Sequence, residues 1–171
     1  MNDLTAPISD KEELDEYRAG QEILIRGVLY TARDKVHSII SKNKQEWPFD
    51  LKNNGIFYCG PTQKSKDFPL GSCGPTTSQR MDPYTPFLYQ QGLALTVGKG
   101  PRSEEVRESI KKNKGLYLVA FGGCGSLYGS KIRKAQIIGF KQLGPQAVYK
   151  IEVRDFPVIV GIDTKGDSIF D

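Results

Sequence analysis

Apolar residues in this chain gather into short runs, and some of the segments between these runs repeat apolar positions at helical spacing. Apolar runs bounded by glycine or proline are typical of buried strands, whereas the spaced pattern predicts amphipathic helices. Strands are predicted at residues 22–31, 56–59, 92–98 and 115–121, and helices at 32–40 and 103–113. Alternation of this kind predicts an α/β domain whose helices pack on a sheet.

The two ends of the sequence add elements outside this alternation. Ser9 and Glu12 have the spacing of a capping box and predict a short first helix that ends at Gly20. Gly27 is expected to bend the strand that contains it. Near the C-terminus the sequence predicts β segments at 137–140, 147–153 and 157–162, the last two joined as a hairpin or meander. The termini are therefore expected to form a second, small sheet.

The composition is that of one globular domain covering residues 1–171. Hydrophobic residues make up 38% of the chain and charged residues 26%, which is ordinary for such a domain. The net charge of +4 is mild and the lysines are scattered, so nucleic-acid binding is not favoured. No apolar run reaches transmembrane length, and the N-terminus lacks the features of a signal peptide. We therefore expect a cytoplasmic protein, not bound to a membrane, with three reduced cysteines.

The segment 71–82 combines a glycine turn, a proline, three hydroxyl residues and an arginine. Pro75 suits the first turn of a helix, which would place the hydroxyls of residues 76–78 at the helix N-terminus, where an anion is favoured. Thr76 and Arg80 are four residues apart and would share one face of that helix. The pattern predicts a carboxylate or phosphate site. A capped helix start with a surface arginine explains the same residues without any ligand.

Two further groups of polar residues follow predicted strands. Arg33 and His37 are four apart at the start of the helix after strand 22–31, and Lys99 follows strand 92–98. Ligands in α/β sheets bind at the carboxyl ends of strands, so we expect these residues to meet residues 76–80 there. His37 is the only histidine, and a structural role is its alternative. The glycine turn at 122–125 lacks a nucleotide-binding pattern.

Several motifs of this chain resemble the C-terminal domain of class I, iron–sulfur-dependent fumarases. That family includes separate β subunits, among them the β subunit of L(+)-tartrate dehydratase. The most specific match is Gly-Pro-Thr-Thr-Ser-Gln-Arg-Met-Asp at 74–82. The other matching stretches, which span nearly the whole chain, are residues 31–37, 60–61, 97–99, 117–123, 155–158 and 163–166.

The resemblance implies a three-layer, swivelling β/β/α domain with a mixed central sheet. It also implies a hetero-oligomer with an alpha subunit that carries a [4Fe–4S] cluster, no metal on this chain, and reversible hydration of fumarate to L-malate. The family motifs assign Arg33, Arg80 and Lys99 to the carboxylates of a small dicarboxylate substrate. They make Thr76 the candidate base and His37 a candidate for proton transfer or for orienting the substrate.

Alternatives to the fumarase assignment remain open. Cys124 in the glycine turn is similar to some tartrate dehydratases, whereas the stretch 117–123 is closer to fumarases. Ser38 and Ile39 stand where the family often has basic residues. The domain could also be a non-catalytic module for anions or protein interaction. A cluster on this chain's own cysteines is not favoured, because they lie in separate predicted elements and form no CxxC motif.

Overall fold

A mixed seven-stranded sheet forms the centre of the computed structural model, which describes residues 2–64 and 66–171. The strands are β1 Asn2–Ala6, β2 Glu22–Thr31, β3 Gly55–Phe57, β4 Leu95–Gly98, β5 Leu116–Val119, β6 Ile132–Gly139 and β7 Val148–Ile162. The α-helices are α1 Asp34–Asn43, α2 Thr85–Gln90, α3 Glu104–Asn113 and α4 Gly125–Ser130. The 3-10 helices are η1 Lys11–Glu16, η2 Ser78–Met81 and η3 Lys141–Gln146.

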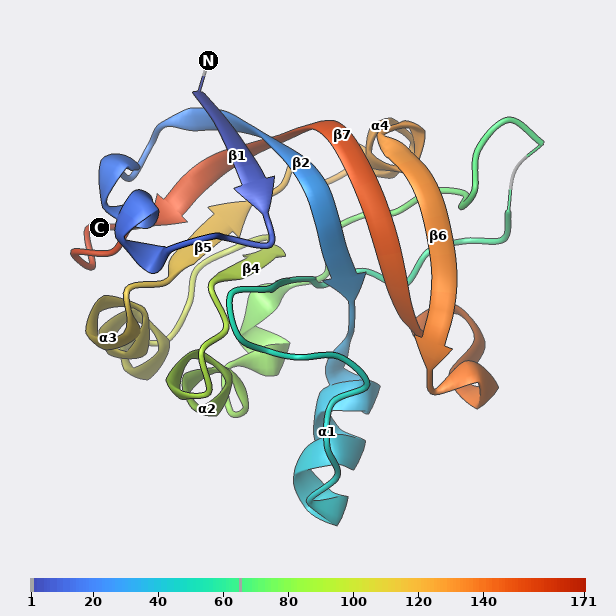
Figure 1. Ribbon diagram of the computed structural model, residues 1–171, viewed down its shortest axis with the longest axis horizontal. Helices are drawn as coiled ribbons and strands as arrows, with labels where there is room; N and C mark the ends of the chain where they lie inside the picture. The colour runs from blue at the N-terminus through green and yellow to red at the C-terminus, as the bar shows by residue number, and fades with distance from the viewer. Residues whose placement is uncertain (1, 65) are drawn as a thin grey trace.

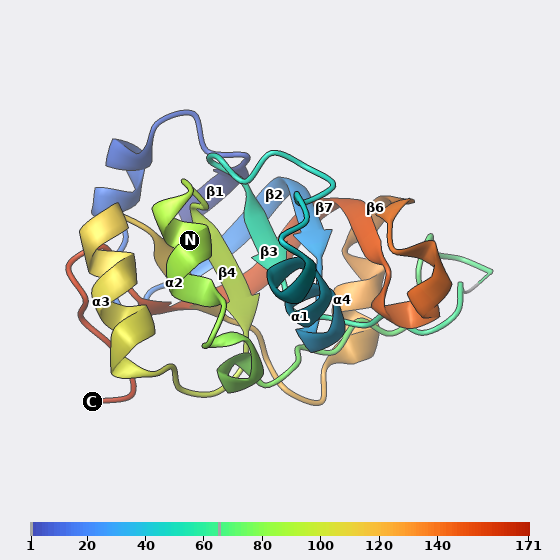
Figure 2. The ribbon, with the colours of Figure 1, turned by 90° about the horizontal axis from the view of Figure 1, so that it is seen from below.

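The strand pairings close into a ring. The strands β2, β3, β4 and β5 run parallel in that order, and the antiparallel strand β7 pairs with both β5 and β2. Figures 1 and 2 show α1, α2 and α3 on one side of β3–β5, with β1, β2, β7 and β6 on the other. The α/β class with a mixed sheet, and the layer order expected from the family resemblance, are therefore confirmed.

Two faces of the parallel strands carry separate cores. Adjacent residues of a strand point to opposite faces, so Phe57 joins the core between the β layers, whereas Ile56 packs under α1 and α2. A third cluster fixes α3 on the sheet through Val106 and Ile110. Because β2–β5 run parallel, their carboxyl ends lie together at one edge of the sheet.

Several predicted elements have the expected bounds. Strand β2 covers residues 22–31, and its pairing with β7 is irregular between Ile25 and Gly27, as the predicted bend requires. Helix α3 begins after Ser103, whose hydroxyl accepts a hydrogen bond from the Val106 N–H.

Among the described residues, no helix combines the length and apolar character that a membrane crossing demands.

Three predictions about the ends of the chain are wrong. The first helix is a 3-10 helix capped by Asp10 rather than Ser9, and it stops at Glu16. The predicted hairpin at 147–162 is one continuous strand, β7, that bends where Asp155 adopts a left-handed φ of 52°. The termini form no second sheet, because β1 pairs in parallel with β2 as part of the same sheet.

Candidate functional site

A polar pocket of about 440 Å³ opens at the carboxyl ends of the parallel strands β2–β5. Arg33 follows β2 and Lys99 follows β4, whereas Thr76 lies on the loop after β3 and Arg80 in the 3-10 helix η2 that ends this loop. The remaining lining residues are Ser72, Gly74, Pro75, Thr77, Gly123 and Gly125. The structure thus brings together four of the five residues singled out from the sequence. No acidic residue of the described chain lines this pocket.

Arg33 enters the pocket from the residue that caps α1. A side chain on Gly60 would place its Cβ 3.1 Å from the Cδ of Arg33, so glycine at this position leaves room for the arginine stem. Asp34 Oδ1 lies 3.7 Å from Arg33 Nε, and neither atom has a hydrogen-bond partner in the described chain. This long contact leaves most of the Arg33 guanidinium free to bind an anion.

The Thr76 segment is extended, so the prediction of a helix N-terminus at residues 76–78 is wrong. The Thr76 N–H donates to the Tyr58 carbonyl at 2.7 Å, and the Thr76 carbonyl accepts from the Lys99 N–H at 3.3 Å. The short 3-10 helix η2 begins only at Ser78. Thr76 and Arg80 therefore reach one pocket because backbone pairing with β3 and β4 holds their loop, not because they share a helix face.

Close packing beside β4 fixes the position of this loop. The Ser78 N–H donates to the Lys99 carbonyl at 2.9 Å, and the Ser78 hydroxyl lies 2.9 Å from the Tyr117 hydroxyl. A Cβ on Gly98 would lie 2.1 Å from Ser78 Oγ, so the loop can approach β4 this closely only because residue 98 is glycine. The Thr76 side chain is 9% exposed, and its hydroxyl makes no hydrogen bond to any described residue.

A buried ion pair that sequence reasoning missed supports the same loop from behind. Arg102 Nε donates to Asp82 Oδ1 at 2.6 Å, and the Arg102 side chain is fully buried. Its other nitrogens donate to hydroxyls of the surrounding elements, namely Thr96 at 3.2 Å, Thr85 at 2.8 Å and Tyr58 at 3.3 Å. The pair ties the end of η2 to β4 and α2. No local pattern could reveal it, because the partners are twenty residues apart in different loops.

His37 does not line the polar pocket, so the prediction that it would meet residues 76–80 there is wrong. Its ring is 1% exposed and packs against the rings of Trp47, Tyr58 and Tyr84. Nδ1 lies 2.8 Å from the Arg33 carbonyl oxygen. Burial lowers the pKa of His37 from 6.5 to about 4, so the ring is neutral at pH 7. A role for His37 in proton transfer stays a prediction that its position does not support.

The chain's own residues do not fit an iron–sulfur cluster. Cys59 and Cys73 are buried, Cys124 is partly exposed, and all three thiols are free. Within the described ranges, no group of three histidine, cysteine or acidic side chains is arranged to hold a metal ion. Burial also raises the pKa of the Cys59 thiol, which disfavours the thiolate that a metal requires.

The fold and the pocket define an α/β domain that presents three cations and a free hydroxyl at the carboxyl ends of parallel strands. The Fumarase C-terminus family matches residues 3–171, and the chain belongs to this family. That match agrees with the resemblance seen in the sequence motifs.

Curated relatives fall into two kinds. Fumarate hydratase 2 of Leishmania major is 35% identical over 98% of this chain, and a class I aerobic fumarate hydratase of Escherichia coli is 32% identical over the same share. The chain spans only about a third of each of these, 31% and 32% respectively. The L(+)-tartrate dehydratase subunit beta of Escherichia coli is 35% identical over 97% of this chain, which covers 85% of that subunit.

Proposed function

We propose that this chain is the β subunit, or C-terminal domain, of a hydro-lyase that reversibly hydrates fumarate to L-malate. One observation carries the proposal. Arg33, Arg80 and Lys99 line a single pocket that contains no acidic residue, and neither Arg80 nor Lys99 has a salt-bridge partner in the described chain. Two cations without a salt-bridge partner among the described residues, beside a third that has only a 3.7 Å contact with Asp34, suit an anion with two carboxylates.

The three cations offer different kinds of contact to such a substrate. A guanidinium can hold a carboxylate through two parallel N–H···O bonds, so Arg33 and Arg80 are suited to orient one carboxylate each. Lys99 supplies a compact point charge, which also favours the extra negative charge that develops beside a carboxylate when its neighbouring carbon loses a proton. Binding and orientation of the dicarboxylate are thereby assigned to this chain.

Thr76 is the candidate base for the carbon-bound proton. Its hydroxyl is free of protein partners and lies in the same pocket as the cations. A threonine hydroxyl is a weak base at its ordinary pKa, and nearby positive charge favours its anionic form. In the dehydration direction Thr76 would take the proton next to the carboxylate, and it would return that proton in hydration.

The departing hydroxide needs a Lewis acid that the described residues do not supply. We infer that an alpha subunit or preceding domain provides it, as the family resemblance to iron–sulfur fumarases implies. The length comparison supports this inference, because the fumarate hydratases are about three times as long as this chain. A hetero-oligomer follows if the partner is a separate chain.

L(+)-tartrate dehydratase is the second candidate function. The observation in its favour is the share of length, since this chain covers 85% of a relative named as a β subunit but only about a third of the fumarate hydratases. Tartrate differs from malate by one hydroxyl, and a pocket that hydrogen-bonds this group would discriminate strongly. The roles proposed for Arg33, Arg80, Lys99 and Thr76 are the same for either substrate.

The test is to combine the chain with a cluster-bearing partner of the fumarase α type under anaerobic conditions. L-malate, fumarate, L-tartrate and D-tartrate are then assayed separately. We expect no turnover of any of these acids by either component alone. The complex should interconvert fumarate and L-malate, or should dehydrate a tartrate if the second candidate function is the right one. A non-catalytic module would be indicated if no complex forms with such partners and no acid reacts.

A further inference from the structure

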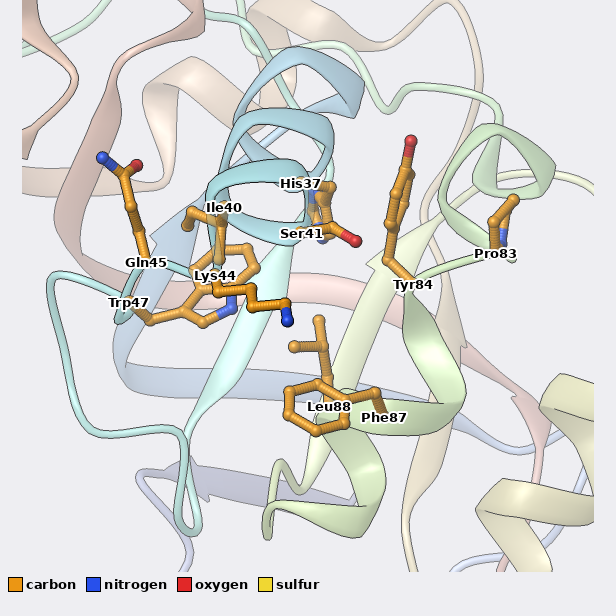
Figure 3. Close-up of a pocket in the computed structure, with 10 residues that line it drawn as sticks. All are labelled: His37, Ile40, Ser41, Lys44, Gln45, Trp47, Pro83, Tyr84, Phe87 and Leu88. Carbon is orange, nitrogen blue, oxygen red and sulfur yellow. The ribbon is translucent and has the colours of Figure 1, made fainter.

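A second pocket, of about 350 Å³, lies between α1 and α2 and shares no lining residue with the polar pocket. Figure 3 shows side chains from both helices and from the loop after α1 converging on it. Its walls are mainly apolar and aromatic, formed by Ile40, Trp47, Tyr84, Phe87 and Leu88. A slot with such walls suits a flat apolar ring system.

His37 supplies an unused hydrogen-bond acceptor at the wall of this pocket. The Arg33 carbonyl can only accept a hydrogen bond, so His37 Nδ1, 2.8 Å away, carries the ring proton and donates it. His37 Nε2 therefore keeps its lone pair. It is buried, and it has no hydrogen-bond partner among the described residues. Figure 3 shows the ring between Trp47 and Tyr84, whose rings contact it.

A single cation stands at the opposite, open side. Lys44 follows α1, and Figure 3 shows its ammonium extending over the pocket between Trp47 and Leu88. Among residues 2–64 and 66–171 it has no salt-bridge partner. The pocket thus offers a hydrogen-bond acceptor at its wall, aromatic sides and a free cation at its mouth. A matching ligand has a hydrogen-bond donor, a flat apolar ring and a negative charge.

We propose that this pocket binds a small aromatic acid, with an O–H or N–H donor for His37 Nε2 and an anionic group for Lys44. Polar groups at two ends of an apolar slot fix the orientation of such a ligand. The proposal does not depend on the hydratase function, because it concerns different residues and a different opening. It assigns His37 a ligand-binding role in place of the proton transfer predicted from the sequence.

The chain contains one tryptophan and one histidine, and both line this pocket. NMR can therefore follow one indole N–H signal and one set of imidazole signals during titration of the full chain. The probe is 6-hydroxy-2-naphthoate, which carries a donor and a carboxylate at opposite ends of a rigid ring. We expect both signals to shift saturably, with the largest nitrogen shift at His37 Nε2.

Two matched probes separate the polar contacts. Replacing the hydroxyl by methoxy removes the donor and should weaken binding about tenfold, the value of one hydrogen bond. In 2-naphthol the carboxylate is absent, and we expect binding to weaken about threefold at low salt. In Lys44→Gln, 2-naphthol and 6-hydroxy-2-naphthoate should bind with equal affinity. In the control Lys112→Gln, which changes an exposed lysine of α3, the difference of about threefold between these two probes should remain.

Other outcomes would overturn the assignment. Equal affinity for the hydroxy and methoxy probes would show that His37 Nε2 accepts no hydrogen bond from the ligand. Ser41→Phe fills the mouth of the pocket from the exposed face of α1, so unchanged binding by this variant would place the ligand elsewhere. If the chain binds the probe alone but not within its assembled complex, the pocket seats a partner's side chain instead. Failure of the hydratase assay would leave all of these titrations unaffected.

Discussion

At the scale of single residues, the polar pocket depends on three cations that have few counter-ions among the described residues. Keeping Arg33, Arg80 and Lys99 close together is unfavourable until an anion binds, because like charges repel at short range. Arg33 has one long contact with Asp34, and the other two cations have no salt-bridge partner among the described residues. Such an arrangement is explained by a ligand better than by stability.

Arg80→Lys tests whether bidentate geometry matters, because it keeps the charge and removes the planar fork. We expect KM for the dicarboxylate in the reconstituted complex to rise about 10–100-fold, the range expected for a charge-assisted hydrogen bond. Arg133→Lys on the exposed face of β6 is the matched control and should leave KM unchanged. Equal KM values for the Arg80 variant and the original would exclude a carboxylate clamp at this position.

His37 should make the chain sensitive to mild acid. Its pKa is about 4 when folded and 6.5 when unfolded, so between these values the unfolded state binds more protons. Stability contributed by the neutral ring is therefore present above pH 6.5 and lost as the pH falls towards 4. From pH 7.5 to 5 we expect His37 to account for a loss of about 2 kcal/mol in unfolding free energy.

Urea unfolding of the original chain and of His37→Phe at both pH values measures this contribution. Phenylalanine keeps an aromatic ring between Trp47 and Tyr84 but cannot bind a proton. We expect the variant to lose less stability than the original between pH 7.5 and 5, by about the stated 2 kcal/mol. Identical losses would show that the buried imidazole does not titrate in this range.

At the scale of elements, the ion pair between Arg102 and Asp82 positions the loop that carries Thr76 and Arg80. Removing one partner leaves the other charge buried, so Arg102→Met and Asp82→Asn should each lower the unfolding free energy by about 3–5 kcal/mol. The double variant should lose less than the sum of the two. Chemical denaturation of all four forms measures the coupling.

The exposed contact between Lys134 and Glu152, 3.5 Å apart, provides the control for that cycle. Lys134→Met should cost less than about 1 kcal/mol, because both side chains remain in water. Strict additivity of the Arg102 and Asp82 substitutions would mean that the buried pair does not act as a unit. That result would contradict the interpretation that the Arg102–Asp82 pair holds η2 against β4.

Elements defined by local patterns could be predicted from the sequence, whereas those set by distant partners could not. Strand β2 shows alternation of apolar residues, and helix α3 shows helical spacing and an N-cap at Ser103. Both elements have the expected bounds. The segment at Thr76 has a helix-start composition, yet its N–H and carbonyl pair with Tyr58 and Lys99. Tertiary pairing of this kind overrides a short local signal.

The bend in β7 shows the same limit. The sequence predicted two strands, at 147–153 and 157–162, but Asp155 turns the backbone at the register shift between Ile25 and Gly27 of β2, and pairing resumes on both sides. A bulge of this kind bends a strand without ending it. The sequence also predicted that Arg33, Arg80 and Lys99 would lie near one another, and the three line one pocket, but it could not tell that His37 lines a different one.

At the scale of the whole molecule, the ring of β2, β3, β4, β5 and β7 places one polar pocket at the common edge of four parallel strands. That pocket has cations and a hydroxyl but no residues suited to a metal cluster. The proposed reaction therefore requires a second component facing this edge. Activity, in this account, belongs to the assembly, and this chain contributes substrate binding and the base.

The most direct test of this account is turnover by Thr76→Ala in the reconstituted complex. We expect kcat to fall at least about 100-fold with KM changed only a few-fold, because a general base acts in the transition state and not in binding. Thr76→Ser keeps a hydroxyl and should retain most of the activity. If Thr76→Ala turns over at the original rate in a complex that binds substrate normally, Thr76 is not the base and the central claim is contradicted.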